Sequence, residues 1–209
     1  MKLRILLDIG HGYKGDTKPA GKRSKPIRIE DPGVVVGSRR EIDVATIYTL
    51  GDGGTWRGLL GELEDRGYPV HRITPGPYAD RQAEAAELAA AHPGDRCVYL
   101  QSHVNAGGGR YALVEHDRAS EWGQAAAELL AEALGELSEV SIGKVASIGP
   151  GERGWICIDG IRPLPTTFAL LLEPGFLDTP AHDPLWGFEG LRHVARQVAI
   201  GLDRYARTL

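Results

Sequence analysis

The chain has 209 residues, of which 42% are hydrophobic and 25% are charged, with a formal net charge of −4 at pH 7. This balance is that of an ordinary globular protein and excludes a disordered chain, and the charge gives no reason to expect a nucleic-acid partner. The length predicts one domain, residues 1–209, that can bury a full hydrophobic core. The two cysteines, Cys97 and Cys157, lie in apolar runs and are expected to be buried free thiols.

No segment of the sequence is typical of membrane insertion or export. No stretch approaches the ~20 apolar residues that span a bilayer. The apolar run after Lys2 and Arg4 ends at Asp8, short of the roughly 7–15 residues that the centre of a signal peptide needs. We therefore expect neither a signal peptide nor a membrane-inserted segment.

Apolar runs and turn residues predict strands that alternate with helices along the chain. Strands are expected over residues 3–8, 70–73, 96–102, 110–115, 155–158 and 168–173. Helices are expected over residues 38–50, 56–66, 79–91, 119–137 and 184–205. Residues 10–38 form a long loop with a short apolar piece, and residues 14–40 carry eight Lys or Arg against three Asp or Glu. The alternation predicts an α/β fold, a layered and mostly parallel mixed sheet flanked by helices.

Three of the predicted strands lead into polar residues that can do chemistry. His11 follows the first strand, His103 follows the third and Glu173 ends the last, each beside Gly or other small residues. In open α/β sheets, ligands bind outside the carboxyl ends of the strands. Two imidazoles and a carboxylate at one such edge suggest a catalytic zinc site, which needs three protein ligands and an open fourth position.

A third ligand has to come from a nearby loop or from the start of a helix. Glu41 opens the helix that follows the long loop. Ser38 and Glu41 also fit a capping box, in which the glutamate binds the backbone at the start of the helix. Spacing alone favours the cap, and the two roles compete for the same carboxylate.

Other titratable residues have weaker claims to a role. Three histidines are expected to lie away from any metal: His71, His92 and His193. His116 and His182 follow predicted strands more closely and are candidates for substrate contact. Asp8 and Asp183 are candidates for orienting metal ligands, although helix capping accounts for Asp183 equally well.

Four motifs in order resemble those of a known enzyme family. DIGHG at residues 8–12, the helix-opening Glu41, SHVNA at residues 102–106 and LLLEPGFLD at residues 170–178 are similar to motifs of the zinc-dependent N-acetylmuramoyl-L-alanine amidases of the type-3 family. The resemblance covers almost the whole chain, from residue 3 to about residue 205. It implies that His11, Glu41 and His103 bind Zn²⁺ and that Glu173 is the catalytic carboxylate.

The same resemblance assigns roles to two further residues. Asn105, the only Asn in the chain, falls in the family's Ser-x-His-x-Asn pattern, and Arg81 matches a position expected to be structural. The chain departs from the family in its long basic loop, in a Gly-rich break at residues 51–54, and at residues 178–179, where the usual Asn is absent. These departures bear on substrate preference more than on the reaction.

The function implied by the resemblance is hydrolysis of the amide between N-acetylmuramic acid and L-alanine in bacterial peptidoglycan. Glu173 would act as general base and then pass the proton to the leaving amine. The expected partner is peptidoglycan, and the expected state is a monomer. A chain of this kind resembles a phage or prophage endolysin that reaches the wall by holin-type release, and a domain trimmed from a secreted autolysin is the alternative.

Two other functional classes stay open at the level of sequence. One is a different zinc hydrolase, such as a carboxypeptidase, although these enzymes usually place a His and a Glu in one HxxE motif, which is absent around His11 and His103. The other is a catalytically inactive wall-binding module, which the presence of both histidines, Glu41 and Glu173 disfavours.

The basic loop can attract carboxylates or anionic wall polymers, and a solvated surface loop is the simpler interpretation.

Overall fold

A six-stranded sheet with the order β4-β1-β5-β8-β6-β7 is the centre of the fold. The structure is a computed structural model that describes residues 1–11, 32–161 and 165–209. Most of the predicted basic loop lies outside the described residues. The strands are β1 (Leu3–Ile9), β4 (Val70–Arg72), β5 (Arg96–Ser102), β6 (Ala112–Asp117), β7 (Gly143–Ile148) and β8 (Thr167–Glu173), and a small separate hairpin joins β2 (Val35–Val36) and β3 (Arg39–Arg40).

Strand direction divides the sheet into two parts. β4, β1, β5 and β8 pair in parallel, and β6 and β7 pair in parallel with each other. Between the two parts, β6 runs antiparallel to β8. The predicted mixed, mostly parallel α/β sheet in a single domain is therefore confirmed.

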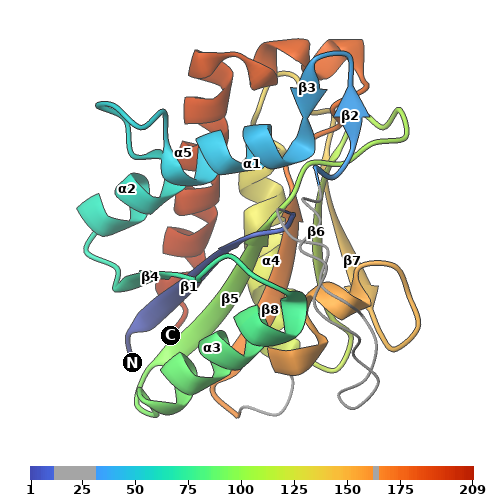
Figure 1. Ribbon diagram of the computed structural model, residues 1–209. Coiled ribbons are helices and arrows are strands. Elements are labelled where there is room, and N and C mark those ends of the chain that lie inside the picture. Colours follow the sequence, from blue (N-terminus) through green and yellow to red (C-terminus); the bar gives the residue numbers. More distant parts are fainter. Residues whose placement is uncertain (12–31, 162–164) are drawn as a thin grey trace.

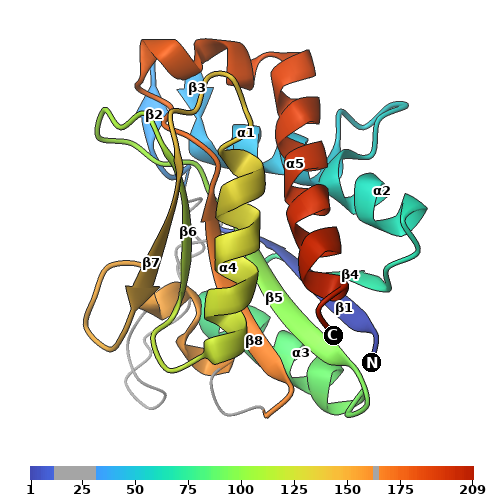
Figure 2. The same ribbon diagram turned by 180° about the vertical axis from the view of Figure 1, so that it is seen from behind.

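Helices cover both faces of the sheet. α1 (Glu41–Leu50), α2 (Gly58–Asp65), α4 (Glu121–Leu134) and α5 (Phe188–Ala206) contribute to the core on one face, and Figure 2 shows α4 and α5 side by side over it. α3 (Tyr78–Ala90) and the short 3₁₀ helices η1 (Trp155–Cys157) and η2 (Asp159–Ile161) cover the other, and α3 lies in front of the sheet in Figure 1. No helix in the described part of the chain has the length and apolar character needed to cross a bilayer.

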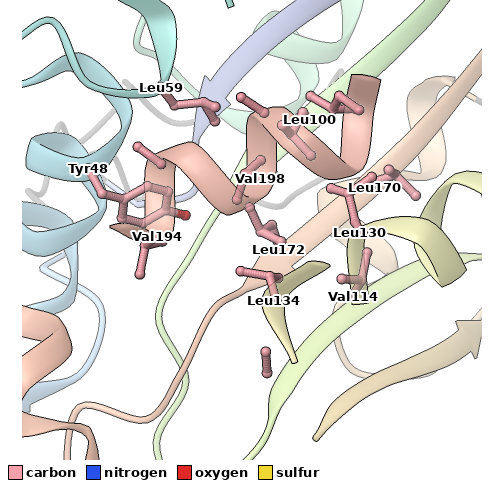
Figure 3. Packing of buried hydrophobic residues seen from close by; sticks show 14 of the residues in the cluster. Tyr48, Leu59, Leu100, Val114, Leu130, Leu134, Leu170, Leu172, Val194 and Val198 are labelled. Carbon is pink, nitrogen blue, oxygen red and sulfur yellow. The ribbon is translucent and has the colours of Figure 1, made fainter. Parts of the chain in front are cut away.

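The central strands are apolar because both of their faces are buried. Every residue of β5 is buried, and its side chains alternate between the two cores. Val98 and Leu100 face the larger core, while Cys97 and Tyr99 face the smaller one. Figure 3 shows Val194 and Val198 of α5 in the larger core, near side chains of β8. The two cores, one on each face of the sheet, hold the carboxyl ends of β1, β5 and β8 in a fixed arrangement.

Most predicted elements are confirmed, with four corrections. Residues 155–158 were expected to be a strand but form η1, because Gly154 has a φ of 84° and turns the chain. β7 was missed, since it lies at the sheet edge with exposed side chains and no apolar alternation. The first helix begins at Glu41 instead of residue 38, because β3 occupies the two preceding residues. The last helix is interrupted at Gly187, which separates the 3₁₀ helix η3 (Pro180–Trp186) from α5.

Candidate metal and catalytic site

The three adjacent parallel strands β1, β5 and β8 end at the same edge of the sheet. Ile9 of β1 pairs with Ser102 of β5, which in turn pairs with Leu172 of β8. His11, His103 and Glu173 follow these paired positions by one or two residues and line one cavity of about 540 Å³. The structure thus places in one cavity the three residues that were predicted to meet at the carboxyl ends of the strands.

His11, Glu41 and His103 form a compact group at this edge. Oε1 of Glu41 lies 3.1 Å from Nε2 of His11 and 3.1 Å from Nδ1 of His103. One ligand atom from each of the three residues lies within 4.8 Å of the other two. A tetrahedral ion with bonds of about 2.0–2.2 Å holds its ligand atoms roughly 3.3 Å apart, so the group fits such an ion.

The carboxylate of Glu41 points to the two imidazoles and does not cap its helix. Arg40 is the N-cap of α1 and makes no side-chain cap hydrogen bond, so the expected capping box with Ser38 is wrong. Glu41 is the first residue of the helix, and its two oxygens accept hydrogen bonds from the backbone N–H groups of Val104, at 3.0 Å, and Val34, at 2.9 Å. These bonds fix the carboxylate at the centre of the group.

The protonation states favour metal binding. Burial alone would raise the pKa of Glu41, but its contacts with His103 and His11 outweigh burial and hold that pKa well below its usual range. Burial lowers the pKa of His103, so this imidazole is neutral at neutral pH. The ionised carboxylate of Glu41 and the neutral imidazole of His103 are the forms in which such side chains bind metals.

A buried hydrogen-bonded chain sets the tautomer of His103. Gln101 donates to Asp8 through Nε2 at 2.8 Å, so its Oε1 is the atom that faces Nε2 of His103, at 3.0 Å. Because that oxygen can only accept, the proton of His103 lies on Nε2 and the lone pair on Nδ1. The lone pair then faces Oε1 of Glu41, another acceptor, and a cation between the two atoms relieves this repulsion.

Asp8 anchors the far end of this chain. It accepts hydrogen bonds from Nη1 of Arg81 at 2.8 and 2.9 Å and from the hydroxyl of Tyr99. Arg81, which is 2% exposed, also donates to the carbonyl groups of Ile9, at 2.6 Å, and Gly10, at 3.0 Å. The structural role predicted for Arg81 is confirmed, and Asp8 acts on His103 through Gln101.

Glu173 lies in the same cavity as the three candidate ligands. It accepts a hydrogen bond from Nδ2 of Asn105, the residue that the Ser-x-His-x-Asn pattern singled out. Burial, followed by the negative charges of Glu115 and Glu41, raises the pKa of Glu173 to about 8. Glu173 therefore holds a proton tightly unless a positive charge lies nearby, which is a property of groups that exchange protons with a substrate.

The remaining predictions about histidine and aspartate divide into confirmed and corrected ones. His116 and His182 were candidates for substrate contact, but both are buried and neither lines the cavity. Nδ1 of His182 instead accepts a hydrogen bond from the backbone of Phe176 at 2.8 Å.

Asp183 pairs with Arg39 at the surface and orients no candidate ligand. As expected, the other three histidines lie outside the group, and both cysteines are buried and free: His71, His92, His193, Cys97 and Cys157.

Sequence reasoning missed part of the cavity wall. Glu115 of β6 and Arg153, which precedes η1, both line the cavity. The signal for Glu115 was a charged residue inside an apolar strand. Arg153 lies among the glycines of residues 149–154, and nothing in that segment distinguishes it from an ordinary turn.

Comparisons with solved structures relate this fold to proteins that include enzymes named as amidases. The CwlD amidase from Clostridioides difficile, solved in complex with the GerS lipoprotein, matches with a TM-score of 0.70 and 17% identity over 100% of both chains. The N-acetylmuramyl-L-alanine amidase Ami1 from Mycobacterium smegmatis matches with a TM-score of 0.68 and 15% identity, over 100% of this chain and 98% of that one. Cwp6 from Clostridium difficile matches with a TM-score of 0.66 and 17% identity over 97% of this chain, which spans only 29% of Cwp6.

Sequence comparisons add no closer relative. No protein-family model matches the chain, and no curated protein matches it. The structural similarities show that the chain shares the fold of these amidases, as the resemblance in four motifs implied.

Proposed function

We propose that residues 1–209 form the catalytic domain of a zinc-dependent N-acetylmuramoyl-L-alanine amidase. The observation that carries the proposal is the arrangement of His11, Glu41 and His103 within 4.8 Å of one another, with Glu173 in the same cavity. The substrate is peptidoglycan, and the bond cleaved joins the lactyl group of N-acetylmuramic acid to L-alanine. The shared fold with enzymes described as amidases supports the same substrate class.

The donor set of the group fits zinc better than magnesium or calcium. Two imidazole nitrogens and one carboxylate oxygen are typical of catalytic zinc sites, whereas magnesium and calcium prefer oxygen ligands. Three protein ligands leave a fourth position for water or substrate. When bound, Zn²⁺ supplies a Lewis acid that polarises the amide carbonyl and acidifies water.

Glu173 carries the proton transfers in this proposal. Its carboxylate takes a proton from the attacking water as the water oxygen bonds to the amide carbon. As the carbon–nitrogen bond breaks, Glu173 returns that proton to the nitrogen of L-alanine, so a carboxylic acid and a free amine result. The hydrogen bond from Asn105 holds the carboxylate in place between these steps.

Glu173 has to be ionised to act as a general base, and a nearby cation favours the ionised form. Burial and two neighbouring carboxylates keep its pKa at about 8. A divalent ion held by His11, Glu41 and His103 would add positive charge to the cavity that Glu173 lines and would lower this pKa, because an opposite charge favours the ionised carboxylate. Metal binding and activation of the base are therefore coupled.

The place of action follows from the substrate. We propose that the chain works at the bacterial cell wall, as an endolysin released from the cell or as part of a secreted autolysin. The basic segment that lies mostly outside the described residues is suited to attract anionic wall polymers.

The decisive experiment is digestion of purified peptidoglycan, followed by mass spectrometry of the soluble products. We expect peptides with a free N-terminal L-alanine and glycan strands with free lactyl groups, and we expect o-phenanthroline to prevent their release. A Glu173→Gln variant serves as the matched control, since it keeps the shape of the side chain. New termini within the stem peptide would favour a carboxypeptidase-like enzyme, and binding without cleavage would favour a wall-binding module.

A further inference from the structure

The cavity continues past Glu173 to a second pair of charged side chains that the proposed reaction does not use. Glu115 and Arg153 line the same cavity as the metal-binding group. Among the described residues that line it, Arg153 is the one Lys or Arg, whereas Glu41, Glu115 and Glu173 are acidic. Three acidic side chains and one basic side chain therefore share this cavity.

The register of the sheet places Glu115 at a defined distance from the catalytic carboxylate. Leu113 pairs with Glu173 and Glu115 pairs with Leu171 across the antiparallel junction. Paired residues point to the same face and so do alternate residues of one strand, so Glu115 and Glu173 are diagonal neighbours about 7–8 Å apart. All four side chains of these two pairs line the cavity.

Arg153 is held close to Glu115 by the turn that follows β7. Gly154 has a φ of 84°, and a Cβ atom at this position would lie 2.4 Å from Oε2 of Glu115. The absence of a side chain lets the backbone beside Arg153 pack directly on the carboxylate. Burial raises the pKa of Glu115 to about 7 and that of Glu173 to about 8, and the positive charge of Arg153 opposes both rises.

The turn is fixed by its neighbours, but the guanidinium of Arg153 is not used in holding it. Glu152 receives two hydrogen bonds of 2.7 Å from Arg118 and one of 2.6 Å from the backbone of Gly149. Gln82 of α3 donates to the carbonyl of Ile156 at 2.9 Å. Within residues 1–11, 32–161 and 165–209, Arg153 makes no hydrogen bond or ion pair to a protein group. A cation at the wall of a cavity on a fixed turn is available to a ligand.

The chemistry of the substrate indicates which group Arg153 can bind. Each residue of an extended peptide spans about 3.3–3.6 Å, so a carboxyl group on the second residue lies roughly 7 Å from the nitrogen of the scissile amide. Arg153 and Glu173 line the same cavity of about 540 Å³, so a carboxylate this close to the scissile bond stays within the cavity. A guanidinium binds a planar carboxylate with two parallel hydrogen bonds, and three acidic residues in the cavity disfavour a polyanion.

We propose that Arg153 is a specificity-determining residue that binds a free carboxylate on the second residue of the stem peptide. This inference rests on the proposed amidase function. It adds that the preferred substrate carries a free carboxylate, and not an amide, on the second residue of its stem peptide. A stem peptide in which this carboxylate is amidated loses the contact with Arg153.

The test compares two muramyl peptides that differ only in whether the second residue carries a free carboxylate or its amide. We expect the wild-type zinc-loaded chain to prefer the free acid by about 10- to 100-fold in kcat/KM, as expected for a charge-assisted contact. Arg153→Gln should abolish the preference by slowing cleavage of the acid alone, and Arg153→Lys should restore part of it. Arg196→Gln, which removes an exposed cation from α5, is the matched control and should leave the preference unchanged.

The outcomes separate this inference from the proposed function. An unchanged preference in Arg153→Gln, or an equal loss with both substrates, overturns the role of Arg153. If the wild-type chain cleaves neither substrate, the amidase function fails, and calorimetric titration of the two product peptides then decides the matter. Tighter binding of the acid that disappears in Arg153→Gln supports the carboxylate site, and equal binding of both peptides refutes it.

Discussion

Asp8 and His103 do not touch, yet Gln101 joins them through hydrogen bonds of 2.8 and 3.0 Å. The amide of Gln101 has one donating and one accepting end, so the negative charge of Asp8 fixes which end faces the imidazole. Nδ1 of His103 is left without a proton as a result, and this nitrogen is the one that faces Glu41. The tautomer of His103, a candidate metal ligand, is thus set by the carboxylate of Asp8, which acts through the side chain of Gln101.

Loss of this connection should weaken metal binding while leaving the ligands in place. We expect Gln101→Leu to lower zinc affinity by about 10- to 100-fold, the usual effect of removing a partner of a metal-binding histidine. Competition with a chromophoric chelator measures this affinity. Tyr99→Phe is the control, because it removes the hydroxyl that donates to Asp8 and accepts from Gln101 at 3.1 Å, but keeps the hydrogen bonds of Gln101 to Asp8 and His103. Its affinity for zinc should stay near that of the wild type.

The two roles considered for Glu41 make opposite predictions. We expect Glu41→Gln to reduce zinc affinity by at least about 100-fold, because it removes the only negative charge from the proposed ligand set. Ser38→Ala should change neither metal content nor melting temperature, since Ser38 does not cap α1. Metal analysis and thermal melting of both variants test the assignment. Full zinc occupancy in Glu41→Gln would remove Glu41 from the ligand set.

Glu173 should be needed for turnover but not for metal binding. We expect Glu173→Gln to retain one zinc per chain and to lose about 10²- to 10⁴-fold in kcat, the usual contribution of a general base. Product release from muramyl peptides and metal analysis of the same sample provide both measurements. Loss of zinc from this variant would mean that Glu173 is a ligand and that the proposed roles are wrong.

The raised pKa of Glu173 predicts how the metal-free chain responds to pH. The folded chain holds this proton up to a pKa of about 8, compared with an ordinary value of 4.5, so the stabilising effect is full at low pH and is lost as pH rises through 8. In EDTA, Glu173→Gln should melt close to the wild type at pH 4 and several degrees above it at pH 9, because glutamine carries no charge that has to be buried. Calorimetry over this range tests the sign, and a wild type that is the more stable form at pH 9 would contradict it.

The ends of buried parallel strands are the part of the site that sequence can predict. His11, His103 and Glu173 follow apolar runs, and parallel topology brings such ends to one edge. The role of Glu41 is harder to predict, because the direction of its carboxylate depends on where α1 begins. The β2–β3 hairpin moves that start from Ser38 to Glu41, and two isolated residue pairs give no periodicity by which to recognise the hairpin.

The wall of the cavity formed after β6 is the least predictable part of the site. β7 lies at the sheet edge, where exposed side chains remove the alternation that identifies a strand. Arg153 reaches the cavity only because Gly154 turns the chain, and neither its type nor its spacing indicates a role. Long-range pairing determines that Glu115 lies diagonal to Glu173, and a single sequence does not contain that register.

The antiparallel junction between β8 and β6 has a consequence for evolution and engineering. The residues proposed to hydrolyse the amide lie on α1 and at the carboxyl ends of β1, β5 and β8, whereas Arg153, which is proposed to bind the peptide, lies in the turn after β7. Arg153 and the proposed catalytic residues line one cavity, but different parts of the sheet position them. Substitutions or insertions after β7 would therefore change the peptide contact proposed for Arg153 while leaving the proposed metal-binding and catalytic residues unchanged.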